Sequence, residues 1–348
     1  MKQWWQPETY ERKIPYLRQR SKIIKAVRNY FDERNFYEVE TPVLQISPGL
    51  EVHLQAFKTA LKEPFTNKES PFYLHTSPEF TMKKLLAAGL PKIYQICHVF
   101  RNGERSERHH PEFTMIEWYR ADSNYYSLME DCKQILQLAT LAAGNKVMHY
   151  NGTDCNPFSD WEMLTVNEAF KRYADIDVLA TIDDADKAAP NPAPLMKEAE
   201  RIGVHTSEND TWEDVFFRIC LDKVEPHLGF NGVPTIFYEY PKCLAALSRT
   251  SPKDKRVSER FEFYVCGLEM GNAFSELTDV EEQRRRFTFD MDMKEKFYGE
   301  RYPIDEDFMS ALSIMPPAAG IAVGIDRVVM AACHAPKISD VLWAEVAE

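Results

Sequence analysis

The sequence has no long apolar run and no excess of basic charge among its 348 residues. No window approaches the roughly 18–20 apolar residues of a membrane span. The N-terminal segment MKQWWQPETYERK also lacks the apolar core of a signal peptide. The formal net charge of −12 argues against broad electrostatic binding to nucleic acid, because phosphate contacts need clustered Lys and Arg. We therefore expect a protein that contacts neither a membrane nor an extended nucleic-acid backbone.

Paired cysteine motifs are also absent. The seven cysteines are scattered along the chain and form no C-x-x-C pair. An odd, dispersed set is typical of reduced thiols in a cytosolic protein and not of a disulfide framework or a zinc site. We expect a cytoplasmic protein in which most of these side chains are small core residues. They are Cys97, Cys132, Cys155, Cys220, Cys243, Cys266 and Cys333.

Apolar spacing indicates a chain whose strands cluster instead of alternating singly with helices. Helical spacing covers residues 18–34, 80–88, 127–141, 211–224 and 281–297. Strand patterns cover residues 37–40, 72–77, 92–101, 112–119, 261–268 and 273–277. Because the strands cluster, we predict a single α+β domain over residues 1–348, with an antiparallel β-sheet flanked by helices.

Proline content refines this prediction at two places. Pro42 follows the first strand and cannot donate to a ladder, so that strand should lie at a sheet edge or a junction. Residues 183–194, DDADKAAPNPAP, are rich in Asp, Ala and Pro, and we expect a surface loop or insertion around residues 180–210.

The segment VFRNGERSERHHPEFTMIEWYR, residues 99–120, reads as strand, polar loop and strand. Arg101 ends the first strand, and Gly103 lies in the loop as its flexible point. Phe113 and Tyr119 share one face of the second strand. An Arg fork can bind phosphate oxygens and an aromatic face can stack on a base, so this hairpin suits a purine triphosphate. An ordinary surface hairpin with a solvated loop is the alternative.

A second phosphate-binding candidate lies near the C-terminus. Residues 320–327, GIAVGIDR, read as a Gly-bearing strand that turns directly into a helix, whose positive N-terminus favours phosphates. Arg327 in the first helical turn is unfavourable for the helix dipole unless an anion faces it. Strand-to-helix packing alone is the alternative.

Acidic residues follow two other strands. Glu79, in Thr76-Ser77-Pro78-Glu79, could read a cationic amino group or could simply suit the first turn of a helix. Glu269 and Glu276 flank a stretch that is otherwise uncharged. Buried acids are costly unless paired, so a metal or a cationic substrate is implied there, with a salt bridge to Arg as the alternative.

Taken together, these segments resemble the class II aminoacyl-tRNA synthetases. The hairpin resembles motif 2 in its lysyl-type form, "FR-x-E … R-H-x-P-E-F-T-M-x-E-x-Y". The helix, strand and proline upstream resemble motif 1, which builds the dimer interface, and residues 320–327 resemble motif 3, whose Arg grips the far end of ATP. Residues 269–277 resemble the string "E-x-x-N-G-F-x-E-L", in which acids bind Mg²⁺–ATP and the side-chain ammonium of the amino acid.

The resemblance runs from about Arg18 to the end and is closest to the catalytic domain of lysyl-tRNA synthetases. Their N-terminal OB-fold domain, which reads the anticodon, has no counterpart in this sequence. This truncated pattern, with EFTMIEWYR in motif 2 and Ala322 where the synthetases usually carry Gly, resembles the elongation factor P lysine ligase family. Those enzymes form an adenylate from lysine, preferably its (R)-β isomer, and transfer it to a lysine ε-amino group of elongation factor P.

Two alternatives stay open beside this interpretation. One is a free-standing enzyme of the lysyl-tRNA synthetase type that acts on tRNA or another small acceptor. The other is a non-catalytic, amino-acid-sensing regulatory paralogue, which the retention of both Arg101 and Arg327 disfavours.

The resemblance also implies the site. The cofactors would be ATP and Mg²⁺, the partners lysine or β-lysine, elongation factor P and a second copy through motif 1, and tRNA would not bind. Arg101 and Arg327 would be catalytic. The ATP site would comprise Arg101, Asn102, Gly103, Glu104, His110, Phe113, Glu269, Met270, Gly324 and Arg327. The substrate site would comprise Ser77, Pro78, Glu79, Tyr119, Glu276 and Ala322, and the metal would bind Glu269 and Glu276. Three positions depart from the family pattern, namely Gly103 for Glu, His110 for Asn and Ala273 for Gly.

Overall fold

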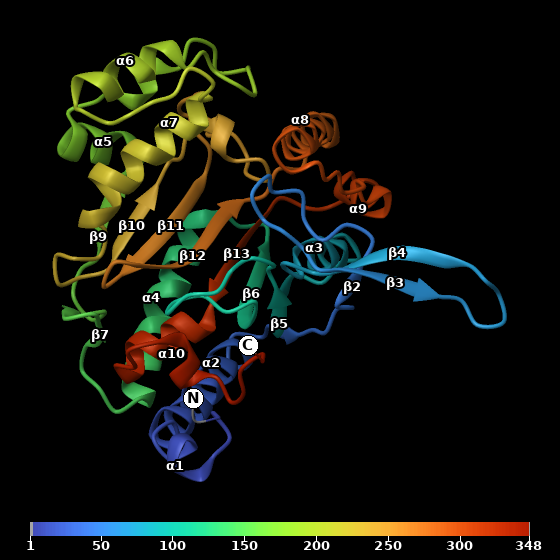
Figure 1. Cartoon of the computed structure of the whole chain (residues 1–348), viewed down its shortest axis with the longest axis vertical. Coiled ribbons are helices and arrows are strands. Elements are labelled where there is room, and N and C mark those ends of the chain that lie inside the picture. The colour runs from blue at the N-terminus through green and yellow to red at the C-terminus, as the bar shows by residue number, and fades with distance from the viewer. Residues whose placement is uncertain (1–2, 348) are drawn as a thin grey trace.

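A computed structural model describes residues 3–347, which are organised around one eight-stranded sheet (Figure 1). Neighbouring strands are antiparallel except β1 with β5 and β9 with β10. This confirms the prediction of an α+β fold with a mostly antiparallel sheet, and the first strand lies at its edge as expected. In spatial order the strands are β1 (Tyr37–Glu38), β5 (Lys92–Phe100), β6 (Glu112–Ala121), β13 (Ala318–Gly324), β12 (Leu268–Ser275), β11 (Arg260–Val265), β10 (Thr235–Tyr238) and β9 (Glu162–Thr165).

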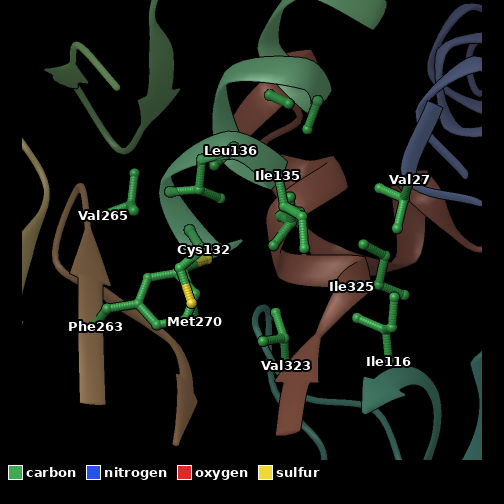
Figure 2. Close-up of a cluster of buried hydrophobic side chains, with 14 of the residues drawn as sticks. Val27, Ile116, Cys132, Ile135, Leu136, Phe263, Val265, Met270, Val323 and Ile325 are labelled. Atoms are coloured by element: carbon green, nitrogen blue, oxygen red, sulfur yellow. The ribbon is translucent and has the colours of Figure 1, made fainter. Parts of the chain in front are cut away.

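Three helices cover one face of this sheet: α2 (Ile14–Asp32), α4 (Tyr125–Ala142) and α10 (Ile325–Cys333). Their apolar sides meet alternate residues of the central strands in the largest hydrophobic cluster (Figure 2). Val27 of α2, Ile135 of α4 and Ile325 of α10 all take part. The helices predicted at 18–34 and 127–141 are confirmed within a few residues, because a regular apolar stripe makes both helices visible in the sequence.

A second hydrophobic cluster lies over the β9–β10–β11 end of the sheet and includes α5 (Val166–Ala174), α6 (Ala193–Arg201) and α7 (Trp212–Ile219). Capping boxes at Thr165 and Thr211 start α5 and α7. Residues 182–192 form the expected loop, but α6 within the 180–210 range was not predicted. The Ala- and Pro-rich sequence hides its two buried positions, Leu195 and Ala199. The assignment of the chain to a single domain stays a prediction.

The third cluster is built by α3 (Glu79–Ala87), α8 (Val280–Tyr298) and α9 (Glu306–Leu312). A three-stranded sheet of β2 (Leu44–Gln45), β4 (Glu69–Leu74) and β3 (Lys58–Lys62) stands beside it, and its β3–β4 hairpin projects from the body (Figure 1). The remaining α-helix is α1 (Pro7–Tyr10), and the remaining strands are β7 (Met148–Tyr150) and β8 (Thr153–Cys155). Short 3₁₀ or π-helical turns are Val178–Thr181, Cys220–Val224, Glu225–His227, Lys242–Leu244 and Ile338–Val341.

All seven cysteines are unpaired, and five of them are buried, as the sequence predicts. Within residues 3–347, no helix is both long enough and apolar enough to cross a membrane.

One irregularity in the central sheet decides which side chains face away from the helices α2, α4 and α10. The register between β11 and β12 shifts at Phe263 and Tyr264, and Met270 has no partner across the ladder. Met270 is therefore the extra residue of a β-bulge. Met270 packs in the hydrophobic cluster under α2, α4 and α10, together with the other side chains on that face of β12. Because of the extra residue, Glu269 lies on the opposite face.

Candidate active site

A cavity of about 500 Å³ lies on the sheet face opposite α2, α4 and α10. Its floor includes Ala322 of β13 and Asn272 of β12, which pair across the sheet. Glu117 of β6 pairs with Ala322 on its other side and is fully buried next to this floor. Most residues expected from the sequence line this cavity. They are Ser77, Glu79, Arg101, Glu104, His110, Phe113, Tyr119, Glu269, Met270, Ala322, Gly324 and Arg327. Asn102, Gly103, Pro78 and Glu276 do not line it.

Two arginines converge at one end of the cavity. Arg101 follows β5, and its guanidinium carbon lies 5.3 Å from the ring centroid of Phe113. Its Nε atom is buried without a hydrogen-bond partner in the described structure, so it is a donor that a bound anion would satisfy. Arg327 lies in the first turn of α10 as predicted, and its Nη1 donates to the Glu269 carbonyl oxygen at 2.7 Å. Two fixed cationic groups therefore face the same space, as a triphosphate requires.

Asp326 holds Arg327 in place although it does not itself act on a ligand in this arrangement. Its carboxylate forms a buried ion pair with Arg20 of α2 and accepts from the Thr114 backbone N at 2.7 Å. Arg20 also donates to the Thr114 hydroxyl at 2.8 Å. The start of α10 is thereby tied to α2 and β6, so the helix N-terminus and Arg327 keep a defined position.

The loop between β5 and β6 shows which carboxylate faces the cavity. Glu104 lines the cavity, whereas Gly103 has a positive φ of 81° and lies outside it. Asn102 is also turned away, and its backbone N donates to the Gln55 carbonyl at 2.8 Å. His110 is buried, with Nδ1 donating to the Glu112 carbonyl at 2.5 Å and Nε2 accepting from the Val346 backbone N at 3.3 Å. Both ring nitrogens are therefore occupied by hydrogen bonds, one within the loop and one to the C-terminal segment.

The expected metal pair, Glu269 with Glu276, is not brought together. Six residues lie between the two positions, which are roughly 20 Å apart along an extended strand. The bulge at Met270 puts both on the same sheet face, but Glu276 lies beyond the end of β12 and is paired with Lys83. One Mg²⁺ cannot bind both carboxylates, because ligand oxygens lie about 2 Å from this ion. The sequence reasoning was wrong here because it took proximity in the chain for proximity in space.

Glu262 of β11 is the carboxylate that does accompany Glu269. Both line the cavity on adjacent strands. Burial and the neighbouring Glu262 raise the pKa of Glu269, which shows that the two charges repel. A pair of such oxygen donors fits Mg²⁺. The described residues hold no group of three or more His, Cys, Asp or Glu side chains suited to a metal, so phosphate and water would supply its other ligands.

Acidic side chains gather at the other end of the cavity. Glu117 accepts from the Ser77 hydroxyl at 2.5 Å and from the Tyr119 hydroxyl at 2.9 Å. Glu79 opens α3 directly after Pro78, which serves as the helix N-cap and not as a lining residue. Burial, together with Glu79, raises the pKa of Glu117 to about 8. This end of the cavity therefore favours cations.

Gly320 and Ala322 of β13 keep the floor low between the two ends. A Cβ atom on Gly320 would lie 2.1 Å from the Tyr119 ring and 2.5 Å from Glu276 Oε1. No side chain fits there, so glycine is required by close approach. Ala322, two residues on, adds one methyl group to the floor of the cavity.

Three residues of the site were missed by the sequence reasoning: Lys83, Glu117 and Glu262. Glu117 alternates with Phe113 and Tyr119, and that pattern could have identified it. Glu262 gives a similar signal beside the buried Phe261 and Phe263. The sequence gives no signal for Lys83, because a lysine at this position looks like any other polar residue of an amphipathic helix.

The antiparallel sheet, the two converging arginines and the acidic end of the cavity are typical of a class II synthetase catalytic domain. The family model for tRNA synthetases class II (D, K and N) matches residues 9–343. The chain is 39% identical over 340 residues to the elongation factor P--(R)-beta-lysine ligase of Histophilus somni (strain 2336), covering 97% of this chain and 96% of that protein. It is 38% identical over 339 residues to the ligase of the same name from Haemophilus influenzae (strain PittGG), with coverage of 97% and 96%. For Salmonella arizonae the identity is 37% over 339 residues, with the same coverage.

The chain therefore belongs to the class II tRNA synthetase family, in the group of the elongation factor P--(R)-beta-lysine ligases. Members of this family are ATP-dependent ligases, and the cavity has the charges that such chemistry needs at both ends.

Proposed function

We propose that this enzyme activates lysine, with the (R)-β isomer preferred, as an adenylate and transfers it to the ε-amino group of a specific lysine of elongation factor P. The observation that carries the proposal is the cavity itself, with Arg101 and Arg327 at one end and Glu79 at the other, where the buried Glu117 lies behind Ser77 and Tyr119. An amino acid that has a second amine can direct its carboxylate to the arginines and its amines to the acids. The curated relatives that bear this name match over 97% of the chain.

The first step needs no nucleophile from the enzyme. The substrate carboxylate oxygen attacks the α-phosphorus of ATP in line, and the bond to pyrophosphate breaks. Arg101 is assigned to the α-phosphate and Arg327 to the γ-phosphate, while Phe113 stacks on adenine once the base displaces the Arg101 contact. Glu104 and His110 line the nucleotide side of the cavity with Met270 and Gly324.

Mg²⁺ is assigned to Glu262 and Glu269, where it would offset charge on the phosphates when bound. Glu269 lies near Arg327, whose Nη1 is 3.9 Å from Glu269 Oε2, and Glu262 is paired with Arg260 at 2.8 Å. The protein thus balances positive and negative groups along the nucleotide.

In the second step the neutral acceptor amine attacks the carbonyl carbon of the adenylate. The bond to the phosphate oxygen breaks, AMP leaves, and the amine loses its extra proton. Ser77, Glu79, Tyr119 and Ala322 keep the activated substrate in place during this exchange, and Glu276 supports them from behind Gly320.

We also propose that the enzyme is a cytoplasmic homodimer that acts on a protein and not on tRNA. Support for a dimer comes from exposed apolar side chains at Tyr37 of β1 and at Val43, Leu44 and Ile46 in and around β2. These positions belong to the segment that resembles motif 1. The net charge of −12 supports a protein acceptor, because tRNA binding needs a basic surface.

The proposal is tested by ATP–pyrophosphate exchange with a panel of amino acids that includes lysine and both β-lysine isomers. Labelled substrate is then offered to elongation factor P and to tRNA in separate reactions. We expect exchange with lysine-type diamino acids and label on elongation factor P alone. Label on tRNA but not on the protein would overturn the proposal in favour of a free-standing tRNA-charging enzyme.

A further inference from the structure

Lys83 lies at the acidic end of the cavity and is almost completely buried, with 2% of the residue exposed. It belongs to α3, one turn after Glu79, and its ammonium forms an ion pair with the Glu79 carboxylate. Its Nζ also lies 2.5 Å from Glu276 Oε2, at the end of β12. Burying an ammonium group is expensive unless carboxylates surround it. Here the two carboxylates outweigh burial and raise the pKa of Lys83 above its ordinary value.

Lys83 is the ammonium group that faces three carboxylates in this region, Glu79, Glu117 and Glu276. Glu51 also lines the cavity and faces Glu79. It has its own cationic neighbours, Arg101 and Lys294, and is counted apart from this cluster. Glu117, from β6, is fully buried and faces Glu79 and Lys83. With Glu79, Glu117 and Glu276 ionised and Lys83 charged, the cluster carries two negative charges in excess. Burial and this crowding raise the pKa of both Glu117 and Glu276 to about 8. This excess negative charge is unfavourable, and a bound cationic ligand would offset it.

The cluster also contains an unpaired acceptor, which lies just behind the cavity floor. Glu276 is 1% exposed, and its Oε1 atom has no hydrogen-bond partner within residues 3–347. The same oxygen lies 2.5 Å from the position that a Cβ on Gly320 would take, so it borders the cavity floor where glycine leaves space. Tyr119, which lines the cavity, contacts both Gly320 and Glu117.

We propose that Lys83 is a positioning and specificity-determining residue that reduces the charge of the Glu79–Glu117–Glu276 cluster to −2, the value matched by the two ammonium groups of a diamino acid. Lys83 touches the carboxylates and not the substrate. This inference rests on the proposed function, since it explains how the charge of the pocket selects the amino acid that the enzyme activates.

The structure explains why a fixed cation is useful there. Without Lys83 the three carboxylates would carry up to three charges against two ammonium groups, and Glu79 and Glu276 would lose the cation that holds them together against their mutual repulsion. A tethered ammonium cannot leave, so the negative charge of the fully ionised cluster is limited to −2 whether or not a ligand is bound. Phe274, whose ring centroid lies 5.1 Å from Nζ, encloses the group on another side.

The test compares Lys83→Met and Lys83→Arg with a control on the same helix, Lys84→Met. Lys84 forms an ion pair with Asp305 at 2.7 Å and lies outside the cavity lining. Exchange kinetics are measured for ATP and for the best diamino acid from pH 6 to 9. In the parent enzyme the KM for the amino acid should fall as the pH rises through about 8, because Glu117 and Glu276 gain charge.

For Lys83→Met we expect the KM for the diamino acid to rise at least tenfold and the KM for ATP to change less than twofold. The fall of KM with pH should move upward by one pH unit or more, because the carboxylates lose their counter-cation. Lys83→Arg should behave more like the parent, and Lys84→Met should leave all three readouts unchanged.

A double variant, Lys83→Met with Glu276→Gln, returns the cluster to −2 and keeps the inference testable if the single variant does not fold. Its KM profile should move back toward the parent position. An unshifted pH profile in folded Lys83→Met, or equal increases in both KM values, would overturn the inference. Failure of the parent enzyme to activate any diamino acid would instead overturn the proposed function, so the two failures are distinguishable.

Discussion

At the scale of single residues, the side chains of the site differ in how far the sequence could assign them. Arg101 and Arg327 could be predicted because a motif fixes each at the end of a strand or the start of a helix. The partner of Glu269 could not, because the carboxylate that faces it comes from another strand. Lys83 was equally hidden, since only folding brings α3 against the end of β12.

Arg101 should be the most sensitive position of the nucleotide site. We expect Arg101→Ala to lower kcat for ATP–pyrophosphate exchange by about 10²–10³, the usual loss when one preorganised donor to a developing charge is removed. Arg105→Ala is the matched control, because Arg105 belongs to the same loop but lies outside the cavity lining. Full exchange activity in Arg101→Ala would show that motif 2 has been assigned wrongly.

Glu117 should make the protein less stable as the pH rises. Its folded-state pKa of about 8 lies above the ordinary value of 4.5, so between these values the folded state holds a proton that the unfolded state releases. Stability from this group therefore falls with rising pH across that window and is lowest above pH 8. Glu117→Gln removes the effect, and its gain in unfolding free energy should reach a few kcal/mol at pH 8, on the order expected for such a shift.

Denaturant unfolding of the parent and of Glu117→Gln at pH 5, 6, 7 and 8 measures this difference directly. The gain should grow steadily with pH. A gain that is the same at every pH would mean that Glu117 does not titrate in this window.

At the scale of elements, regular patterns could be predicted and irregular ones could not. The strands that became β5 and β6 and the helices that became α2 and α4 follow from simple alternation or an apolar stripe. The start of β12 was placed five residues late, at Ala273, because a bulge breaks its alternation. Bulges depend on the partner strand, which local sequence does not specify.

The junction of α2, β6 and α10 should depend on the Arg20–Asp326 ion pair. Removing one partner leaves the other charge buried and uncompensated, so Arg20→Met should lower the unfolding free energy by about 3–5 kcal/mol. Arg28→Met is the control on the same helix, because the Arg28–Glu38 pair is exposed and worth at most about 1 kcal/mol. Equal losses in the two variants, measured by denaturant unfolding, would contradict this account of the junction.

At the scale of the whole molecule, the fold class followed from the clustering of strands, but the three hydrophobic clusters and the projecting β3–β4 hairpin did not. The grouping of strands can be seen from the order of elements along the chain. Which helices cover each end of the sheet depends on long-range packing, which the order of elements does not specify. The surface that would join two copies is likewise visible only as exposed apolar residues in the folded chain.

A homodimer through β1 and β2 predicts a change of mass in a surface variant. Leu44→Glu combined with Ile46→Glu should convert the dimer to a monomer, because both exposed side chains would be charged at the interface. Light scattering after size-exclusion chromatography measures the mass, and Leu61→Glu, an exposed change on β3, serves as the control. A dimer that persists in the double variant would place the interface elsewhere.

The bulge at Met270 makes β12 tolerant of changes in residue type at that position and of the loss of that one residue. Substitutions at Met270 would alter only packing. Deletion of Met270 would remove the extra residue and restore regular alternation, so Glu269 and Glu276 would both stay on the face that carries the site. Sequences that share this site should therefore keep both glutamates on one face whether or not they carry the extra residue between them.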